Sequence, residues 1–456
     1  MDTKEADGAS GVTGYEKALR RWYVGGFLGE DMTLAFPQWR AVTGAFILAL
    51  CMLILSGAAS RAQADCGPGV FVPQQVIVKL DPTVGATVQK INSTYGTTTL
   101  ETFPGSTNIY LLRLPTGSGV TETVKQMTKD RRLLYAEPNF ISQAPEGRAR
   151  HSAFGVSDAA PGSDEYAIKA LGLASAHDIS RGTGTRVAVL DTGAQLDHPA
   201  LIDNFEDARR YDFVEGDKNP SDRPLGRDKD CDGAKDEMMG HGTHVAGIVD
   251  ITAPAAKIMP LRVLDTEGYG NVFTLAKAVY FARHNSADVI NLSLGSPSRA
   301  KLLQEVINDA TADGVLVAAA AGNSNSLVAE YPAAGNGVAA SADGLVAVTS
   351  VNMYDQRSGF ANYGTWVDIA APGESIRSAF PVSKYAYWSG TSMATPFVSG
   401  QGALIHAVYG KLDPAGVEER IRCSAKSLLA TDPVYAAMMG AGRNDVGASL
   451  REGACS

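Results

Sequence analysis

Short runs of apolar, mostly β-branched residues recur along the second half of the chain, each bounded by Gly or Asp. Such continuous runs are typical of strands that a parallel sheet buries on both faces. Stretches with helical spacing separate the runs. The pattern predicts an α/β domain over residues 164–456, built on a mostly parallel sheet flanked by helices, with strands at 187–190, 257–264, 289–293, 315–320 and 345–351.

The region before it, residues 65–145, has a different pattern that predicts a smaller α/β domain. Alternating residues indicate strands at 76–80 and 110–114, and a further extended segment at 133–140. Helical spacing covers 86–95, where Gly96 ends the helix, and 120–130. Residues 146–163 are rich in Ala, Gly, Pro and Ser, and we expect an exposed linker that is open to proteolytic nicking.

Residues 1–64 contain an apolar run at 41–59, preceded by Arg40 and followed by Ala62-Gln63-Ala64. This order is that of a secretory signal peptide cleaved after Ala64. If translation starts at Met32, the segment before the apolar run is short and carries the positive charge of Arg40. An uncleaved membrane anchor is the alternative, because about 19 apolar residues can just cross a bilayer.

Composition limits the partners and the compartment. The 456 residues carry a net charge of −9, so there is no electrostatic reason to expect nucleic acid. Of the five cysteines, Cys51 lies in the apolar run, and Cys423 with Cys455 are the natural disulfide pair near the C-terminus. Cys66 and Cys231 are either free or paired, since sequence does not determine connectivity.

Four polar residues stand where a strand ends or a helix begins. Asp191 ends the run 186–190, and His241 opens a helix over 242–249. Ser392 lies at the start of a helix over 391–409, and Asn323 follows the run 318–321. A serine becomes a nucleophile when an imidazole takes its proton and a carboxylate orients that imidazole. Each residue alone could instead cap a helix or form a turn.

The motifs around these residues resemble those of subtilisin-like serine proteases, the subtilases: Val189-Leu190-Asp191-Thr192-Gly193, His241-Gly242-Thr243-His244-Val245-Ala246-Gly247 and Gly390-Thr391-Ser392-Met393-Ala394-Thr395-Pro396. Phe397 departs from the family pattern, which often has His there. The resemblance implies Ser392 as nucleophile, His241 as base and Asp191 as its orienting group. It also implies Asn323 in the oxyanion hole and residues 65–145 as an inhibitory propeptide, the alternative being an unrelated small domain.

Subtilases bind extended peptide as an added strand. The matching substrate-binding edges here are Ser293-Leu294-Gly295 and Gly268-Tyr269-Gly270. Next to Tyr331-Pro332, Glu330 falls at the floor of the primary specificity pocket by resemblance, which favours Lys or Arg before the cleaved bond. Arg150 would then suit self-cleavage. The alternative is that Glu330 faces solvent.

An acidic loop offers oxygen ligands for calcium. Asp228, Asp230 and Asp232 have calcium-loop spacing, with Asp236 nearby as a fourth ligand. The Glu expected at the twelfth position is absent, since Met239 stands there, and a solvated acidic loop is the alternative.

We interpret the chain as an exported, monomeric serine endopeptidase that is made as an autoprocessed zymogen and needs no cofactor for catalysis. Its partners are a peptide or protein substrate and its own propeptide, with a membrane involved only if 41–59 stays uncleaved. The alternatives are a secreted binding protein that keeps the fold, a membrane-anchored processing protease with few substrates, and an esterase.

Overall fold

The computed structural model describes residues 69–456, except 150, 164, 336–342, 411, 454 and 456. The signal peptide, the anchor alternative, Cys51, Cys66 and Arg150 therefore lie outside the described residues. No helix in the described ranges combines the length and apolar character needed to cross a membrane. Cys423 and Cys455 form a disulfide with their Cα atoms 5.4 Å apart, and Cys231 is also disulfide-bonded.

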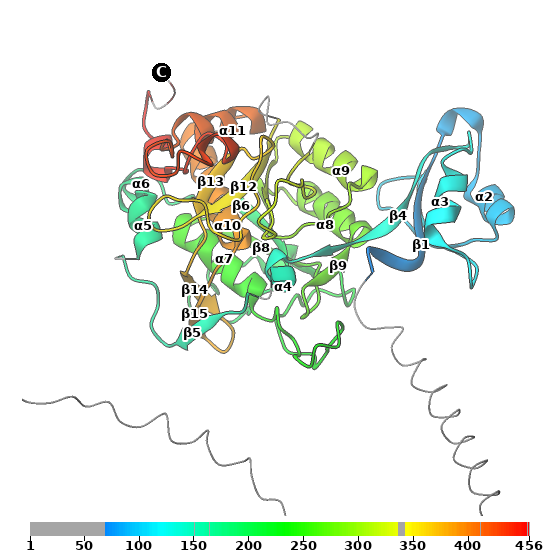
Figure 1. Ribbon diagram of the computed structural model, residues 1–456, viewed down its shortest axis with the longest axis horizontal. Helices are drawn as coiled ribbons and strands as arrows, with labels where there is room; N and C mark the ends of the chain where they lie inside the picture. Colours follow the sequence, from blue (N-terminus) through cyan, green and yellow to red (C-terminus); the bar gives the residue numbers. More distant parts are fainter. Residues whose placement is uncertain are drawn as a thin grey trace, which may run out of the picture. The chain divides into compact units, whose positions relative to one another are not determined.

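The expected parallel sheet is present and has seven strands in the order β13-β12-β11-β10-β6-β8-β7 (Figure 1). All its strand pairs are parallel. Central strand β10 is buried throughout because both faces of the sheet are covered, as its apolar sequence requires. The strands are β6 (Arg186–Asp191), β7 (Tyr211–Asp212), β8 (Lys257–Arg262), β10 (Val289–Leu292), β11 (Leu316–Ala320), β12 (Leu345–Val351) and β13 (Ile369–Pro372).

Two buried helices, α7 (His241–Thr252) and α10 (Thr391–Tyr409), carry the predicted His and Ser at their first turns. They approach closely because Gly400 of α10 faces Thr252 of α7, where an added Cβ would lie 2.5 Å from the Thr252 Cβ. The other helices are α5 (Tyr166–Ala170), α6 (Leu173–Ile179), α8 (Val272–His284), α9 (Lys301–Ala312), α11 (Pro414–Cys423) and α12 (Val446–Ser449), with short 3₁₀ turns at Asp207–Arg209 and Ala436–Met438.

The N-terminal region folds around its own apolar cluster. Its fully buried members are Val76 and Val78 of β1, Ile91 of α2, Leu112 of β3 and Met127 of α3. The predicted elements form, and the sequence patterns missed one further strand, β2. The elements are β1 (Phe71–Leu80), a 3₁₀ turn (Pro82–Val84), α2 (Val88–Tyr95), β2 (Thr98–Thr102), β3 (Ile109–Arg113), α3 (Val120–Met127) and β4 (Leu133–Gln143).

Strand β4 runs from this region into the large domain, as Figure 1 shows. The Glu137 carboxylate accepts hydrogen bonds from Lys301 N (2.7 Å) and Leu302 N (3.0 Å) at the start of α9. Asn139 Oδ1 accepts from Phe273 N at the start of α8 (3.0 Å). These contacts satisfy backbone amides that have no partner inside a helix. The end of β4 then pairs with β9 (Tyr269–Asn271).

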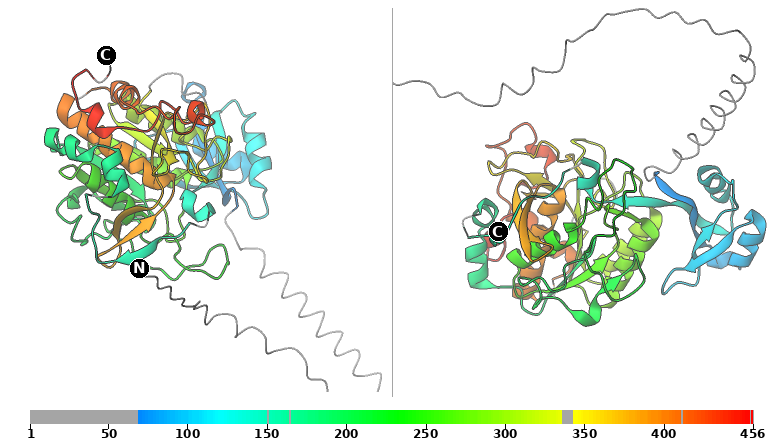
Figure 2. Two further views of the ribbon diagram at one scale, coloured as in Figure 1. Left: turned by 60° about the vertical axis from the view of Figure 1, so that its left-hand side comes forward. Right: turned by 90° about the horizontal axis from the view of Figure 1, so that it is seen from below.

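Most of the linker from residue 152 onward is exposed, as expected, but its start is not. Residues 144–146 are buried and lead into a short helix, α4 (Pro145–Ala149). Farther on, β5 (Phe154–Ser157) pairs with β15 (Lys384–Trp388), which pairs with β14 (Ile376–Phe380) (Figure 2). The composition suggested exposure because the linker has few large apolar residues. Its start is buried because the Glu146 carboxylate forms hydrogen bonds inside the large domain.

Candidate active site

Asp191 and His241 meet at the end of β6. The His241 Nδ1 atom lies 2.7 Å from Asp191 Oδ1, and both side chains are fully buried. The edge of the Trp388 ring packs against the imidazole at a centroid distance of 5.3 Å. A carboxylate in this place fixes which ring nitrogen carries the proton and leaves Nε2 to face the site.

Gly242 lets helix α7 approach the turn after Asp191. A Cβ at Gly242 would lie 2.1 Å from Gly193 O, so a larger residue would push the helix away. Asp222 holds the same helix start: its carboxylate accepts from Gly240 N (2.9 Å) and Thr243 Oγ1 (2.8 Å). Burial raises the pKa of Asp222 to about 6, although these hydrogen bonds oppose the shift.

Ser392 and Asn323 face the same point from α10 and from the end of β11. Asn323 Oδ1 accepts from Thr391 N at 2.9 Å, which turns its amide nitrogen toward the site. The Ser392 backbone N–H lies in the first turn of α10, where amides are unpaired and the helix dipole favours negative charge. These are the two donors expected of an oxyanion hole.

The carboxylate of Glu146 occupies this point. Its Oε2 accepts from Ser392 Oγ (2.6 Å) and lies 3.0 Å from His241 Nε2. Its Oε1 accepts from Asn323 Nδ2 (2.8 Å) and Ser392 N (3.3 Å). No hydrogen bond joins His241 to Ser392 directly in the described structure; both bind the same oxygen instead. All four groups contact one negatively charged carboxylate. A negatively charged oxygen also forms during acyl transfer.

The two carboxylates around His241 control its charge. Burial lowers the pKa of His241, but Asp191 and Glu146 outweigh it and raise that pKa to about 10. Burial would raise the pKa of Glu146, but hydrogen bonds and charge from His241 lower it below the ordinary value. His241 therefore carries a proton at neutral pH in this arrangement and has no capacity to take one from Ser392.

The chain's own segment 141–144 lies between the two predicted substrate edges. Gln143 exchanges both backbone hydrogen bonds with Gly295 at 2.9 Å. On its other side, residues 141–143 pair with β9, which contains Tyr269 and Gly270, and Ala144 N donates to Gly268 O at 3.0 Å. Of the other predicted edge residues, Ser293 donates from Oγ to Ser392 O (2.9 Å), and Leu294 is fully buried.

Glu330 does not face solvent. Only 6% of its surface is exposed, and its carboxylate forms an ion pair with Arg148 of α4 at 3.0 Å. Gly322 packs on the same carboxylate, with an added Cβ placed 2.8 Å from Glu330 Oε1.

The acidic loop brings together three of its four predicted ligands. Carboxylate oxygens of Asp228, Asp230 and Asp232 lie within 4.8 Å of one another, and Asp228 Oδ1 is buried without a hydrogen-bond partner. Hard oxygen ligands of this kind suit calcium. Asp236 is turned away, because its carboxylate accepts from Leu225 N and Gly226 N. Asp230 also lies close to Glu237 and Glu267, a second acidic group that the spacing did not indicate.

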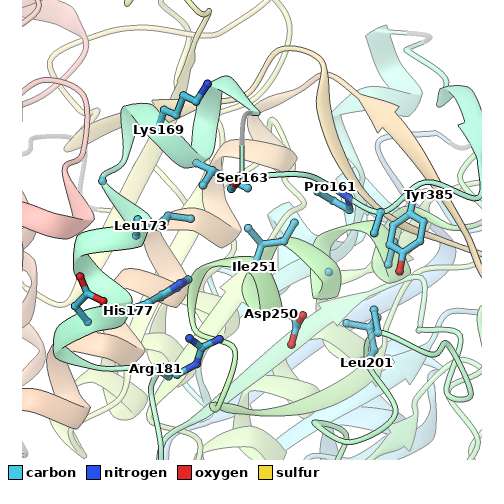
Figure 3. A pocket seen from close by; sticks show the side chains of 18 residues that line it. Pro161, Ser163, Lys169, Leu173, His177, Arg181, Leu201, Asp250, Ile251 and Tyr385 are labelled. Carbon is cyan, nitrogen blue, oxygen red and sulfur yellow. The ribbon is translucent and has the colours of Figure 1, made fainter.

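A separate cavity of about 660 Å³ lies beside α6 and α7. Figure 3 shows His177, Arg181, Asp250 and Tyr385 around it, and neither Ser392 nor His241 lines it. It is therefore distinct from the site at Ser392.

Three contributors to the site were missed by sequence reasoning: Glu146, Arg148 and Asp222. Glu146 and Arg148 lie in a small-residue stretch that looks like a linker, and Asp222 lies in an irregular loop. None has a motif of its own. The one available signal was that the first two are charged residues close behind a segment expected to enter the active site.

Known proteins share both parts of the chain. The subtilase family model matches residues 182–442, and the model of the fervidolysin N-terminal prodomain matches residues 57–139. Fervidolysin from Fervidobacterium pennivorans, described as a keratinolytic enzyme related to subtilisin, has a similar fold, with a TM-score of 0.66 over 84% of this chain and 62% of that one, at 21% identity. A protease from Pseudoalteromonas arctica PAMC 21717 gives a TM-score of 0.54 at 31% identity, covering 61% of this chain and 93% of that one.

Named relatives include two proteases of moderate identity. A thermophilic serine proteinase of Bacillus sp. (strain AK1) is 35% identical over 297 residues, 63% of this chain and 66% of that one, so the chain spans just under two thirds of its length. Thermitase of Thermoactinomyces vulgaris is 37% identical over 243 residues, 53% of this chain and 82% of that one. Since the subtilase model covers more than half of the sequence, and the prodomain model precedes it, the chain belongs to the subtilase family of serine proteases and carries an N-terminal prodomain.

Proposed function

We propose that the protein is a serine endopeptidase that acts through Asp191, His241 and Ser392 and is made as a self-processed zymogen. The observation that carries this proposal is the convergence of Ser392 Oγ, His241 Nε2, Asn323 Nδ2 and the Ser392 N–H on one carboxylate. A site that gathers these groups around an anionic oxygen is suited to the tetrahedral intermediate of acyl transfer.

The proposed reaction has two halves. Ser392 Oγ attacks the peptide carbonyl carbon while His241 Nε2 takes its proton, and the carbonyl oxygen becomes the oxyanion held by Asn323 and the Ser392 N–H. His241 then gives the proton to the leaving amine, and an acyl-enzyme remains on Ser392. Water, activated by the same imidazole, releases the acid. Asp191 orients His241 and stabilises its positive charge. The chemistry requires no cofactor.

In the intact chain, we propose that Glu146 keeps the site closed. The carboxylate fills the oxyanion position and pairs with protonated His241, so the base and the oxyanion donors are both engaged. Residues 141–144 occupy the backbone edges where substrate would pair. The prodomain is the intramolecular inhibitor in this proposal, and release requires that the linker be cut and Glu146 leave.

Export through cleavage after Ala64 and a structural calcium at Asp228, Asp230 and Asp232 belong to the same proposal. Export supplies a compartment in which the Cys423–Cys455 disulfide is stable. The buried, unpartnered Oδ1 of Asp228 supports a cation there.

The test is the intact mass of the purified protein, compared between wild type, Ser392→Ala and the control Ser389→Ala. Ser389 lies three residues from Ser392, and its Oγ accepts from Ser375 N. We expect wild type and Ser389→Ala to lose the prodomain and Ser392→Ala to keep it. If all three stay full length, the binding-protein alternative replaces this proposal; if all three are trimmed, another protease performs the processing.

A further inference from the structure

The Glu330 carboxylate lies at the position expected for the floor of the specificity pocket. It is buried, and Arg148 is its one cationic partner among the residues that the structure describes. Its Oε1 accepts from Ser324 Oγ and Asn362 Nδ2, both at 3.3 Å. Its Oε2 pairs with Arg148 Nη1 at 3.0 Å. Burying a polar group without a partner is costly, so the contact with Arg148 stabilises this arrangement.

The cation comes from the linker and not from the pocket walls. Arg148 lies on α4, two residues beyond Glu146, and its guanidinium also donates from Nη2 to Gly295 O (2.9 Å) and from Nε to Gln143 Oε1 (3.1 Å). When the linker is cut and leaves, all three contacts go with it. Glu330 then lies behind the substrate edge at Gly295 without a counter-ion from Arg148.

The Glu330 carboxylate lies beside both the proposed oxyanion donor and the predicted substrate edge, because Gly322 and Gly295 both pack on it. Gly322, which packs on Glu330, directly precedes the oxyanion donor Asn323, and Gly295 lies on the substrate edge. Gly322 has φ +102°, and a side chain there would collide with both Asn362 and Glu330. The position therefore favours glycine, because Asn362 and Glu330 already fill the space that a side chain would need. The Arg148 guanidinium occupies the space on the other side of the carboxylate, between Glu330 Oε2 and Gly295 O. A side chain from the residue that supplies the scissile carbonyl would enter this space.

We propose that Glu330 makes this pocket select Lys or Arg as the substrate residue before the cleaved bond, with Arg148 held in it as the chain's own stand-in. This rests on the proposed peptidase function. An arginine matches the contacts already made by Arg148, whereas a neutral side chain leaves Glu330 buried and unpaired, and an acidic one repels it.

The experiment uses the self-processed protein and peptides of one sequence that differ only in the residue before the cleaved bond: Arg, Lys, Phe or Glu. We expect kcat/KM for Arg and Lys to exceed that for Phe by about tenfold or more, and Glu to be the poorest. Glu330→Gln keeps the shape but removes the charge, and we expect it to lower kcat/KM for Arg and Lys to the level of that for Phe. Glu419→Gln, a charge removed from the exposed surface of α11, is the matched control and should behave as wild type.

Benzamidine provides a measurement that needs no variant, because its amidinium resembles a guanidinium. We expect competitive inhibition of the wild-type enzyme, weakened about tenfold or more in Glu330→Gln. Phe cleavage equal to Arg cleavage in the wild type would overturn the basic pocket while leaving the peptidase function in place. An Arg preference that survives Glu330→Gln would overturn the role of Glu330. If no peptide is cleaved and Ser392 does not react with a phosphonofluoridate, the proposed function fails, and this inference fails with it.

Discussion

Replacing Glu146 should change the titration of His241 and the latency of the intact chain. In a Ser392→Ala background we expect the chain to stay uncut, so that Glu146 keeps its contacts with His241 Nε2 (3.0 Å) and Asn323 Nδ2 (2.8 Å). Adding Glu146→Ala removes one of the two carboxylates that raise the pKa of His241. Glu146→Gln keeps the size of the side chain and removes only the charge.

The expected change in the pKa of His241 follows from the loss of one charge-assisted hydrogen bond. Such a bond contributes about 1.5–3 kcal/mol, and 1.36 kcal/mol corresponds to one pKa unit. We therefore expect the pKa of His241 to fall from about 10 by roughly 1–2 units in either double variant. In the otherwise wild-type chain, the same energy predicts that Glu146→Ala makes the first self-cleavage faster, by roughly 10- to 100-fold.

The assay is NMR of the histidine ring nitrogens as a function of pH, with self-cleavage followed by intact mass on refolding. Asp158→Asn is the control, because Asp158 is an acidic residue of the same linker that contacts Lys384 at the surface. It should leave both readouts unchanged. If the pKa of His241 is the same with and without Glu146, the carboxylate does not hold the proton on the base, and the proposed closure is refuted.

The ion pair between His241 and Glu146 is stable only within a defined range of pH. His241 has a raised pKa. Its contribution to the stability of the closed site is therefore complete below its ordinary pKa of 6.5 and is lost as the pH rises toward 10. Glu146 has a lowered pKa, so its contribution is complete above its ordinary value of 4.5 and is lost in acid. We expect the intact chain to be most tightly closed between these two ordinary values and to open progressively in alkali.

Four further outcomes are expected. Asn323→Ala should lower kcat about 10²- to 10³-fold with little change in KM, the range measured for the matching donor in subtilisin, and an unchanged kcat would remove Asn323 from the oxyanion hole. Asp222→Ala should lower the melting temperature and kcat together, since it leaves Gly240 N and the Thr243 hydroxyl proton without an acceptor, at about 1–3 kcal/mol each. Burial raises the pKa of Glu137 to about 7, so prodomain binding takes up a proton and weakens as the pH rises from 4.5 to 7; Glu137→Gln should flatten this dependence in a pH series of prodomain release. Calcium chelation should lower the melting temperature of the wild type but not of Asp230→Asn, and equal shifts would place the metal elsewhere.

The large domain could be predicted from sequence because its strands are read directly from continuous apolar runs. Strand β10 was expected at 289–293 and spans Val289–Leu292, and helix α10 has the expected bounds, Thr391–Tyr409. Strand β2 was missed because its residues, Thr98–Thr102, are largely exposed and polar and are held by pairing with β3. Strand β5 was missed for a similar reason: it is short, exposed, and specified only by its partner β15.

The site was predictable in part. Asp191 and His241 come together as expected because the strand end and the helix start are both set by local sequence. The Glu146 carboxylate between His241 and Ser392 was not predictable, since it depends on how a distant linker crosses the site. Asp236 was predicted as a ligand but does not join the other three carboxylates. Its spacing suits a calcium ligand, but the backbone amides of Leu225 and Gly226 donate hydrogen bonds to its carboxylate.

The pairing of Gln143 with Gly295 has a consequence for the storage of the mature enzyme. In the proposed processed form, the amide and carbonyl of Gly295 and the carbonyl of Gly268 are left without these partners, and they can pair with the backbone of another extended chain. Unfolded copies of the same protein are such chains. Loss of activity should therefore follow second-order kinetics in enzyme concentration near the unfolding temperature, and a tight-binding peptide should slow it without changing the intrinsic stability of the fold.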